Sequence, residues 1–245
     1  MKFRYIATLC VGILVFLILG NSLLKGNSRL SNGNSKTSEI HVQKVKWDLG
    51  IGEDSQEVKI YAKSMSIAQR EKIKFYISSD QLKTYKIIEP VYKGNNRFAF
   101  KYPFKKKSTY YISAFLNEQT IDSKIFQDDK EISSELYPTS ILTMKQPNYH
   151  VTLLFNSLQT KKNNVLTFDF NQFKSHHPRI KNHQIYIVSE DGSFFKSLTN
   201  TSKKTKLKYE LTFPTEGMYV LFYEFELNNK KEHFQYIIDV KDKVN

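Results

Sequence analysis

One strand pattern occurs twice in the chain, and this repeat constrains the fold more than any other feature of the sequence. Residues 76–114 and 186–223 share an ordered series of matches over most of their length. The matched pairs include Tyr76 with Tyr186, Ile77 with Ile187, Tyr85 with Phe195, Phe104 with Phe213, and Tyr110 with Tyr219. Each copy has the pattern of a strand that ends at an acidic residue, a turn, an aromatic-lysine strand and a loop. An apolar strand that ends in Phe, a tight turn and a long strand that begins with Tyr follow. We interpret the repeat as a duplication of one β-rich unit.

Most of the remaining sequence has the period of β-strands, since short runs of β-branched and aromatic residues alternate with polar ones. Met65–Lys72 is the best candidate for a helix, of one or two turns. Together with the repeat, this predicts an all-β fold with two tandem immunoglobulin-like β-sandwich domains of about seven strands each. We expect β-sandwich domain 1 over residues 41–136 and β-sandwich domain 2 over residues 137–245. The stretch Pro138–Pro147 is the expected seam between them.

The N-terminal segment has the composition of a membrane span. Residues 5–24 carry no charge, and 20 residues in a helix cover about 30 Å, the thickness of a bilayer core. Lys2 and Arg4 precede the run and predict that this end stays in the cytoplasm. We therefore expect a signal anchor or transmembrane helix over residues 1–24, with the rest of the chain outside the cell. The alternative is a cleaved signal peptide and a secreted protein. Residues 25–40 are rich in Ser, Asn, Gly and Lys and predict a flexible linker.

Two segments of the second copy resemble a known family. Residues 182–195 read NHQIYIVSEDGSFF and residues 211–222 read LTFPTEGMYVLF. Both are similar to segments of a bacterial extracytoplasmic β-sandwich family related to YtkA/FixH-like domains, whose members show "VVSxD", a turn and an aromatic residue, and later "FPxxGxYxLF". The resemblance covers about residues 150–240, and the first copy more faintly. It implies a β-sandwich that lies outside the cytoplasmic membrane.

Metal-associated members of that family carry histidines just before the "VVSxD" strand and in a later "HxHP" segment, and they handle copper or other heavy metals. This chain departs from that motif. Gln184, Ser197 and Thr199 stand at the histidine positions, and Asn200 stands at the proline position. The resemblance therefore implies a degenerate member that lacks the His motif.

Three histidines, His176, His177 and His183, lie within eight residues and are the candidate metal ligands. Imidazole is a common ligand of copper and zinc. Adjacent histidines on a strand would point to opposite faces, so a shared site requires a loop, which Pro178 permits. No carboxylate is close in the sequence, and a neighbouring arginine and lysine would repel a cation. Two interpretations stay open, a copper or zinc site and a solvated basic loop.

The motifs of common enzyme classes are missing from the sequence. There is no GxSxG, HExxH or P-loop pattern, and the single cysteine, Cys10, lies within the apolar N-terminal run. Acidic pairs such as Glu190–Asp191 have no partner carboxylate elsewhere with which they could act as a general acid and base. We interpret them as turn-forming or solvated groups. We therefore expect no catalytic residues, no resident cofactor and no enzymatic activity.

The chain is strongly basic, with 37 Lys and Arg against 24 Asp and Glu and a net charge of +13. Runs of lysine flank several predicted turns: 105–107, 161–162, 203–204 and 230–231. Lysines at these places protect strand edges, or they bind an anionic surface such as lipid head groups or teichoic-acid-like wall polymers. A nucleic-acid partner is not expected, because the N-terminal segment places the protein outside the cell.

We therefore expect a membrane-anchored, extracytoplasmic, non-catalytic binding or accessory protein of the bacterial cell envelope. Its expected partners are the membrane, through the N-terminal helix, and anionic envelope polymers or a protein. The alternative from a different class is an extracytoplasmic copper- or heavy-metal-binding protein that uses the three histidines.

Overall fold

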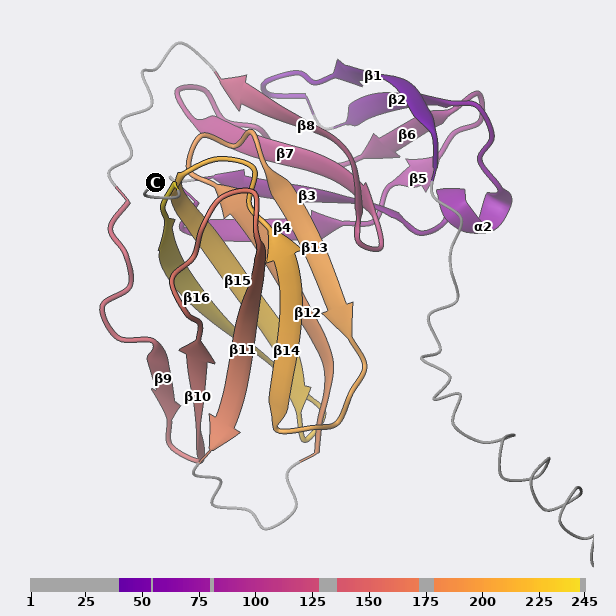
Figure 1. The fold of residues 1–245 in the computed structure, drawn as a ribbon. Helices are drawn as coiled ribbons and strands as arrows, with labels where there is room; N and C mark the ends of the chain where they lie inside the picture. Colours follow the sequence, from indigo (N-terminus) through magenta and orange to yellow (C-terminus); the bar gives the residue numbers. More distant parts are fainter. Residues whose placement is uncertain (1–39, 54, 80–81, 128–135, 172–178, 243–245) are drawn as a thin grey trace, which may run out of the picture. The chain divides into compact units, whose positions relative to one another are not determined.

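The computed structural model describes residues 40–53, 55–79, 82–127, 136–171 and 179–242, and most of these residues lie in β-strands. They form four antiparallel sheets of four strands each, two from each half of the chain (Figure 1). The all-β architecture that the sequence predicts is confirmed.

The first half forms a sandwich, called here the first sandwich, with sheets of order β1-β2-β6-β5 and β4-β3-β7-β8. Its strands are β1 (Val42–Asp48), β2 (Gln56–Ala62), β3 (Ile73–Ser79), β4 (Thr84–Ile88), β5 (Val91–Tyr92), β6 (Arg97–Phe100), β7 (Thr109–Leu116) and β8 (Gln119–Gln127). A single helical turn, α2 (Ile67–Arg70), connects β2 to β3, and Ser66 and Gln69 form a capping box at its start. This turn lies inside the segment that the sequence indicated as the best helix candidate.

The second half forms the second sandwich, with sheets of order β14-β11-β10-β9 and β13-β12-β15-β16. Its strands are β9 (Thr143–Gln146), β10 (Tyr149–Leu154), β11 (Asn163–Asn171), β12 (Ile180–Ser189), β13 (Phe195–Asn200), β14 (Lys206–Thr212), β15 (Gly217–Leu227) and β16 (Lys230–Val240). The expected seam, residues 138–147, contains strand β9. Upstream of β9, the Thr139 amide donates to the carbonyl of Ile237, and the Ile237 amide donates to Thr139 Oγ1.

The register of the strand pairs supports the duplication. Tyr76 of β3 lies opposite Ser113 of β7, and in the second sandwich Tyr186 of β12 lies opposite Phe222 of β15. These are the positions that the sequence alignment equates. Seven strands correspond in order, β1–β4 and β6–β8 with β10–β13 and β14–β16, while β5 and β9 have no counterpart. The seven corresponding strands of each half therefore form a three-plus-four-stranded sandwich of immunoglobulin-like type, and β5 or β9 adds a fourth strand to the smaller sheet.

Each sandwich has its own hydrophobic core between its two sheets. In the first, Phe75 stacks on Phe100 with ring centroids 4.9 Å apart. In the second, Phe168 and Tyr223 are both fully buried, with ring centroids 4.0 Å apart. Aromatic side chains fill the space between sheets with few rotatable bonds, which accounts for the high aromatic content of the chain.

A third apolar cluster joins the two sandwiches. The strands that form it are buried on both faces, because one face lies on a core and the other on the opposite sandwich; seven of the eight residues of β7 are buried. The buried members of the cluster are Tyr76, Leu82, Tyr111, Phe115, Tyr186, Val188, Phe195, Val220 and Phe222. Residues 40–245 consequently form one compact unit that contains both sandwiches.

The predicted signal anchor over residues 1–24 and nearly all of the predicted linker lie outside the described residues, so both stay predictions. Within the residues that the structure describes, no helix is long and apolar enough to cross a membrane. Ile40, at the end of the predicted linker, is only 2% exposed. Its amide donates to Gln119 Oε1 at 2.9 Å, and Gln119 Nε2 donates to its carbonyl at 2.7 Å. The first sandwich therefore includes Ile40.

Candidate functional site

Strand β14 is an edge strand whose outer face carries Lys206 and Lys208, followed by Glu210 and Thr212. It reads KLKYELT and alternates strictly, with Leu207, Tyr209 and Leu211 buried against the core and the other residues exposed. The alternation places Lys206 and Lys208 on the same outer face, about 6.8 Å apart along the strand. The lysine row is therefore a consequence of the period of two that also builds the core.

The turn before β14 extends the row. Lys203 and Lys204 are exposed, and the backbone around them is held by two local hydrogen bonds. Asn200 Oδ1 accepts from the Ser202 amide at 2.8 Å, and Ser202 Oγ accepts from the Lys204 amide at 3.2 Å. Such side-chain-to-backbone bonds are typical of turns.

Lys206 is the one lysine of this row with a carboxylate of a described residue within ion-pair distance, although Glu210 follows Lys208 on the same face. Lys206 Nζ lies 3.6 Å from Asp169 Oδ2, and both side chains are partly exposed. No carboxylate oxygen of a described residue lies within ion-pair distance of Lys203, Lys204 or Lys208. We use the name "β14 basic row" for Lys203, Lys204, Lys206 and Lys208.

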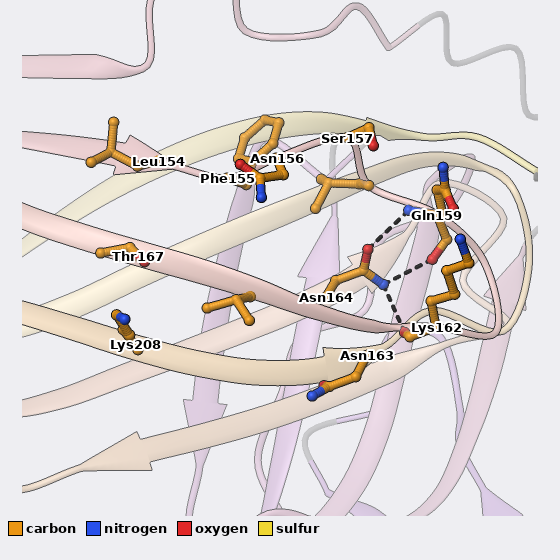
Figure 2. A pocket seen from close by; sticks show the side chains of 12 residues that line it. Leu154, Phe155, Asn156, Ser157, Gln159, Lys162, Asn163, Asn164, Thr167 and Lys208 are labelled. Atoms are coloured by element: carbon orange, nitrogen blue, oxygen red, sulfur yellow. Dashed lines mark hydrogen bonds between the residues drawn. The ribbon is translucent and has the colours of Figure 1, made fainter.

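A pocket of about 760 Å³ lies beside the β14 basic row on the outer face of the same sheet. Its floor comes from β10, β11 and β14, which neighbour one another in that sheet, and its wall comes from the loop between β10 and β11 (Figure 2). The lining residues are Leu154, Phe155, Asn156, Ser157, Leu158, Gln159, Lys162, Asn163, Asn164, Val165, Thr167 and Lys208.

The lining combines apolar surface with positive charge. Leu154 is 42% exposed and Val165 is 40% exposed, and both contribute apolar surface to the lining. Lys162 and Lys208 contribute two ammonium groups, and none of the described lining residues is a carboxylate. The Gln159 side-chain oxygen is buried and has no hydrogen-bond partner among the described residues. The pocket thus suits an anionic group that also offers a hydrogen-bond donor.

Asn164 fixes the shape of the pocket loop. Its Oδ1 accepts from the Gln159 amide at 2.9 Å, and its Nδ2 donates to the carbonyls of Gln159 and Lys162 at 2.8 and 2.9 Å (Figure 2). The side chain is 6% exposed, so water cannot easily replace these bonds.

Replacing Asn164 by Ala is expected to destabilise the protein by about 1–3 kcal/mol, because three backbone groups lose a buried partner. Urea denaturation of residues 40–245 measures the change. Asn163→Ala is the matched control, since Asn163 is exposed and its side chain bonds only to Glu210, and it should cost less than about 0.5 kcal/mol. Equal effects of the two variants would contradict the assigned role of Asn164.

His183, one of the three candidate metal ligands, lies in the core of the second sandwich. A bulge in the β12–β15 pairing between Lys181 and Gln184, with Asn182 at φ 55°, turns this side chain inward. His183 is 2% exposed. The interpretation of this residue as part of a solvated loop is therefore wrong.

Both ring nitrogens of His183 have partners. Nε2 lies 3.1 Å from the carbonyl oxygen of Ser202, which can only accept, so Nε2 carries the proton. Nδ1 lies 2.8 Å from the Tyr223 hydroxyl and therefore accepts from it. Burial lowers the pKa of His183 to about 4, although the bond to Ser202 acts in the opposite direction. A metal ion could bind this ring only by displacing one of these two partners.

His176 and His177 lie outside the described residues, and the described part of the chain contains no group of three or more His, Cys, Asp or Glu residues arranged to hold a metal. The copper or zinc hypothesis therefore stays a prediction, and equilibrium dialysis tests it. On that hypothesis, stoichiometric uptake disappears when His176 and His177 are replaced by Ala. It persists when His41 and His233, both exposed, are replaced instead. No uptake, or equal uptake by both variants, rejects the hypothesis.

The acidic pair Glu190–Asp191 forms a turn, as the sequence indicated. Asp191 Oδ1 accepts from Ser189 Oγ at 2.6 Å, from the Ser193 amide at 3.0 Å and from Ser193 Oγ at 2.8 Å. Partial burial favours the neutral carboxyl, yet these hydrogen bonds prevail and lower the pKa of Asp191. Its role is local and structural.

Comparisons with known proteins find no matching family model and no matching curated protein. The resemblance to the YtkA/FixH-like family therefore stays a prediction. Among solved structures, the chain is similar to a two-domain fibronectin type-III segment of chicken tenascin. That match has 12% identity and a TM-score of 0.27 and covers 82% of this chain and 99% of that chain. A second match is to the FN1–FN3 domains of chicken CNTN1, with 9% identity, a TM-score of 0.26, and coverage of 83% and 68%. Because both TM-scores are low, the fold assignment rests on the strand order and register.

Proposed function

We propose that the protein is a membrane-anchored, extracytoplasmic, non-catalytic binding module of the bacterial cell envelope, and that it binds a linear anionic polymer. The observation that carries the proposal is the β14 basic row beside a pocket whose described lining holds two ammonium groups and no carboxylate. The N-terminal apolar segment supports the membrane address.

The geometry of the row favours a polymer over a compact ligand. Lys206 and Lys208 stand at alternate positions of an exposed edge strand, and Lys204 stands two residues earlier in the turn before it. Lys162 belongs to the loop that forms the wall of the pocket. A polymer with one phosphate on each short polyol unit places successive charges along such a row. Attraction of this kind is long-ranged and is screened by salt.

Lysines on an edge strand such as β14 can also serve only to prevent pairing with another chain. A comparison of two edge strands separates this protective role from polymer binding. Strand β1 is an edge strand of the first sandwich and exposes Lys44 and Lys46 at the same alternate spacing. The first sandwich therefore supplies a control with the same charge, spacing and edge position.

Residues 40–245, titrated with polyglycerol phosphate at low salt, are expected to bind it. Replacing Lys206 and Lys208 by Gln is expected to weaken binding roughly 10- to 30-fold, at about 1 kcal/mol for each lysine. Replacing Lys44 and Lys46 by Gln should change the affinity less than about 2-fold, within the effect of net charge alone.

Isothermal titration calorimetry at low and physiological salt measures these affinities. Absent binding, binding that salt does not weaken, or equal losses in the two double variants would each reject the proposal. Binding to anionic vesicles with no binding to the polymer would assign the row to lipid head groups and reject the polymer as the ligand.

A further inference from the structure

The contact between the two sandwiches is reciprocal. Tyr76 packs on Phe195 with ring centroids 4.9 Å apart, and Tyr186, the counterpart of Tyr76, packs on Tyr85, the counterpart of Phe195, at 5.5 Å. Tyr76 and Tyr186 also face each other at 6.0 Å. In an isologous interface between identical subunits, residue i of one subunit contacts residue j of the other, and residue j of the first contacts residue i of the second. The contacts between the two sandwiches follow this rule. The local two-fold axis passes between Tyr76 and Tyr186.

The turns that flank these strands follow the same symmetry. Leu82 has φ 63° and its counterpart Gly192 has φ 68°, so both turns use the left-handed conformation at the same position. Gly192 lies directly against the Tyr111 ring, since a Cβ on Gly192 would be 2.1 Å from Tyr111 Cδ1. Leu82 belongs to the apolar cluster that contains Val220, the counterpart of Tyr111. Each turn therefore contacts the other sandwich, since the Leu82 carbonyl accepts a hydrogen bond from Gln235 Nε2 of β16.

One reciprocal pair departs from the symmetry in its chemistry. The Tyr85 hydroxyl donates a hydrogen bond to Glu224 Oε1, and both burial and this carboxylate raise the pKa of Tyr85. On the other side of the axis the counterparts are Phe195 and Phe115, whose ring centroids lie 5.3 Å apart. One side of the interface thus holds a hydroxyl–carboxylate pair, and the other holds two phenyl rings.

We infer that this face is a pairing surface whose partner is the other sandwich of the chain. The Tyr85–Glu224 hydrogen bond favours the pairing of a first with a second sandwich, called here the unlike pair, over the pairing of two first or two second sandwiches. Two second sandwiches, paired by the same symmetry, would place Glu224 against Phe195 twice and leave two partly buried carboxylates without a donor. Two first sandwiches would place Tyr85 against Phe115 twice and leave two hydroxyl groups without an acceptor. A partly buried polar group without a partner costs free energy, and of the three pairings only the unlike pair gives both Tyr85 and Glu224 a hydrogen-bond partner.

The inference is tested on the folded chain after one cut between the sandwiches. A protease site replaces residues 129–134, the folded protein is cleaved, and isotope-labelled and unlabelled cleaved samples are mixed. Native mass spectrometry then identifies which halves pair. The expected result is complexes of one first and one second half only, stable at roughly micromolar concentration. Separation of the halves, or like pairs as abundant as unlike pairs, overturns the inference.

Two variants locate the source of selectivity. In Glu224→Leu, pairs of second halves are expected to appear, while Glu210→Leu, which removes an exposed carboxylate on the outer face, keeps only unlike pairs. Tyr85→Phe removes only the hydroxyl oxygen, so it tests the role of the Tyr85–Glu224 pair even if Glu224→Leu does not fold. It should weaken unlike pairing about 10- to 100-fold, because the Glu224 carboxylate loses its donor. Unchanged pairing in both Glu224→Leu and Tyr85→Phe would overturn the assigned role of this pair.

Discussion

Tyr76→Ala is expected to destabilise the protein by about 3–5 kcal/mol, the usual cost of removing a fully buried aromatic side chain. Tyr76 is completely buried, and its ring lies near those of Tyr85, Tyr186, Phe195 and Phe222. All of these rings belong to the cluster between the sandwiches and none to the core of the first sandwich. The loss should therefore fall on the interface, and calorimetry should resolve one unfolding transition in the wild type and two in the variant.

A tyrosine on the surface provides the control for this change. Tyr61 of β2 is 39% exposed, and Tyr61→Ala should cost less than about 1 kcal/mol and leave a single transition. A loss of less than about 1 kcal/mol in Tyr76→Ala would contradict the description of the interface as a rigid, buried contact.

The second large effect concerns pH. The stability of the second sandwich is expected to fall by about 3 kcal/mol as the pH falls from 6.5 to about 4. The reason is that burial lowers the pKa of His183 from its ordinary value of 6.5 to about 4. In this pH range His183 is protonated in the unfolded chain and neutral in the folded chain, so lowering the pH favours unfolding. From about one pH unit above 6.5 the ring is neutral in both states and its contribution no longer changes.

Urea denaturation at a series of pH values measures this dependence. In His183→Gln the part of the slope between pH 4 and 6.5 that belongs to this ring should disappear. In His233→Gln, which changes an exposed histidine of β16, the slope should stay as in the wild type. An unchanged slope in His183→Gln would show that the ring is charged or solvated in the folded protein.

The repeat and the strand periodicity predicted the architecture well, for a physical reason. A strand with one face on a core must alternate, so Val151-Thr152-Leu153 and similar runs could be recognised without coordinates. The register of Tyr76 and Tyr186 within their sheets also followed from the alignment, because duplicated strands keep the same neighbours. These features depend on the local sequence pattern and on the internal repeat.

The interface could not be predicted in the same way. The matched tyrosines Tyr76 and Tyr186 marked the repeat in the sequence, but the repeat did not indicate that they lie between the sandwiches, where the structure places them. The signal was present in the sequence, since a strand such as β7 (TYYISAFL) loses its alternation when both faces are buried. Periodicity alone does not say what covers the second face.

The candidate site was predicted only in part. The lysine run 203–204 was noted and a strand ending at Phe213 was expected, but the continuation of the run through Lys206 and Lys208 on one face of that strand was not predicted. The pocket depends on Asn164, whose three hydrogen bonds shape a loop that composition does not reveal. The inward position of His183 required a bulge at Asn182, and a single sequence gives little indication of such a bulge.

The central functional claim is that β14 and the neighbouring pocket form one anion-binding face. An NMR titration of residues 40–245 with polyglycerol phosphate tests it most directly, because every backbone amide reports its own position. The claim predicts saturable shift changes confined to residues 154–167 and 203–212. Changes centred on strands of the first sandwich, or no saturable change at low salt, would contradict it.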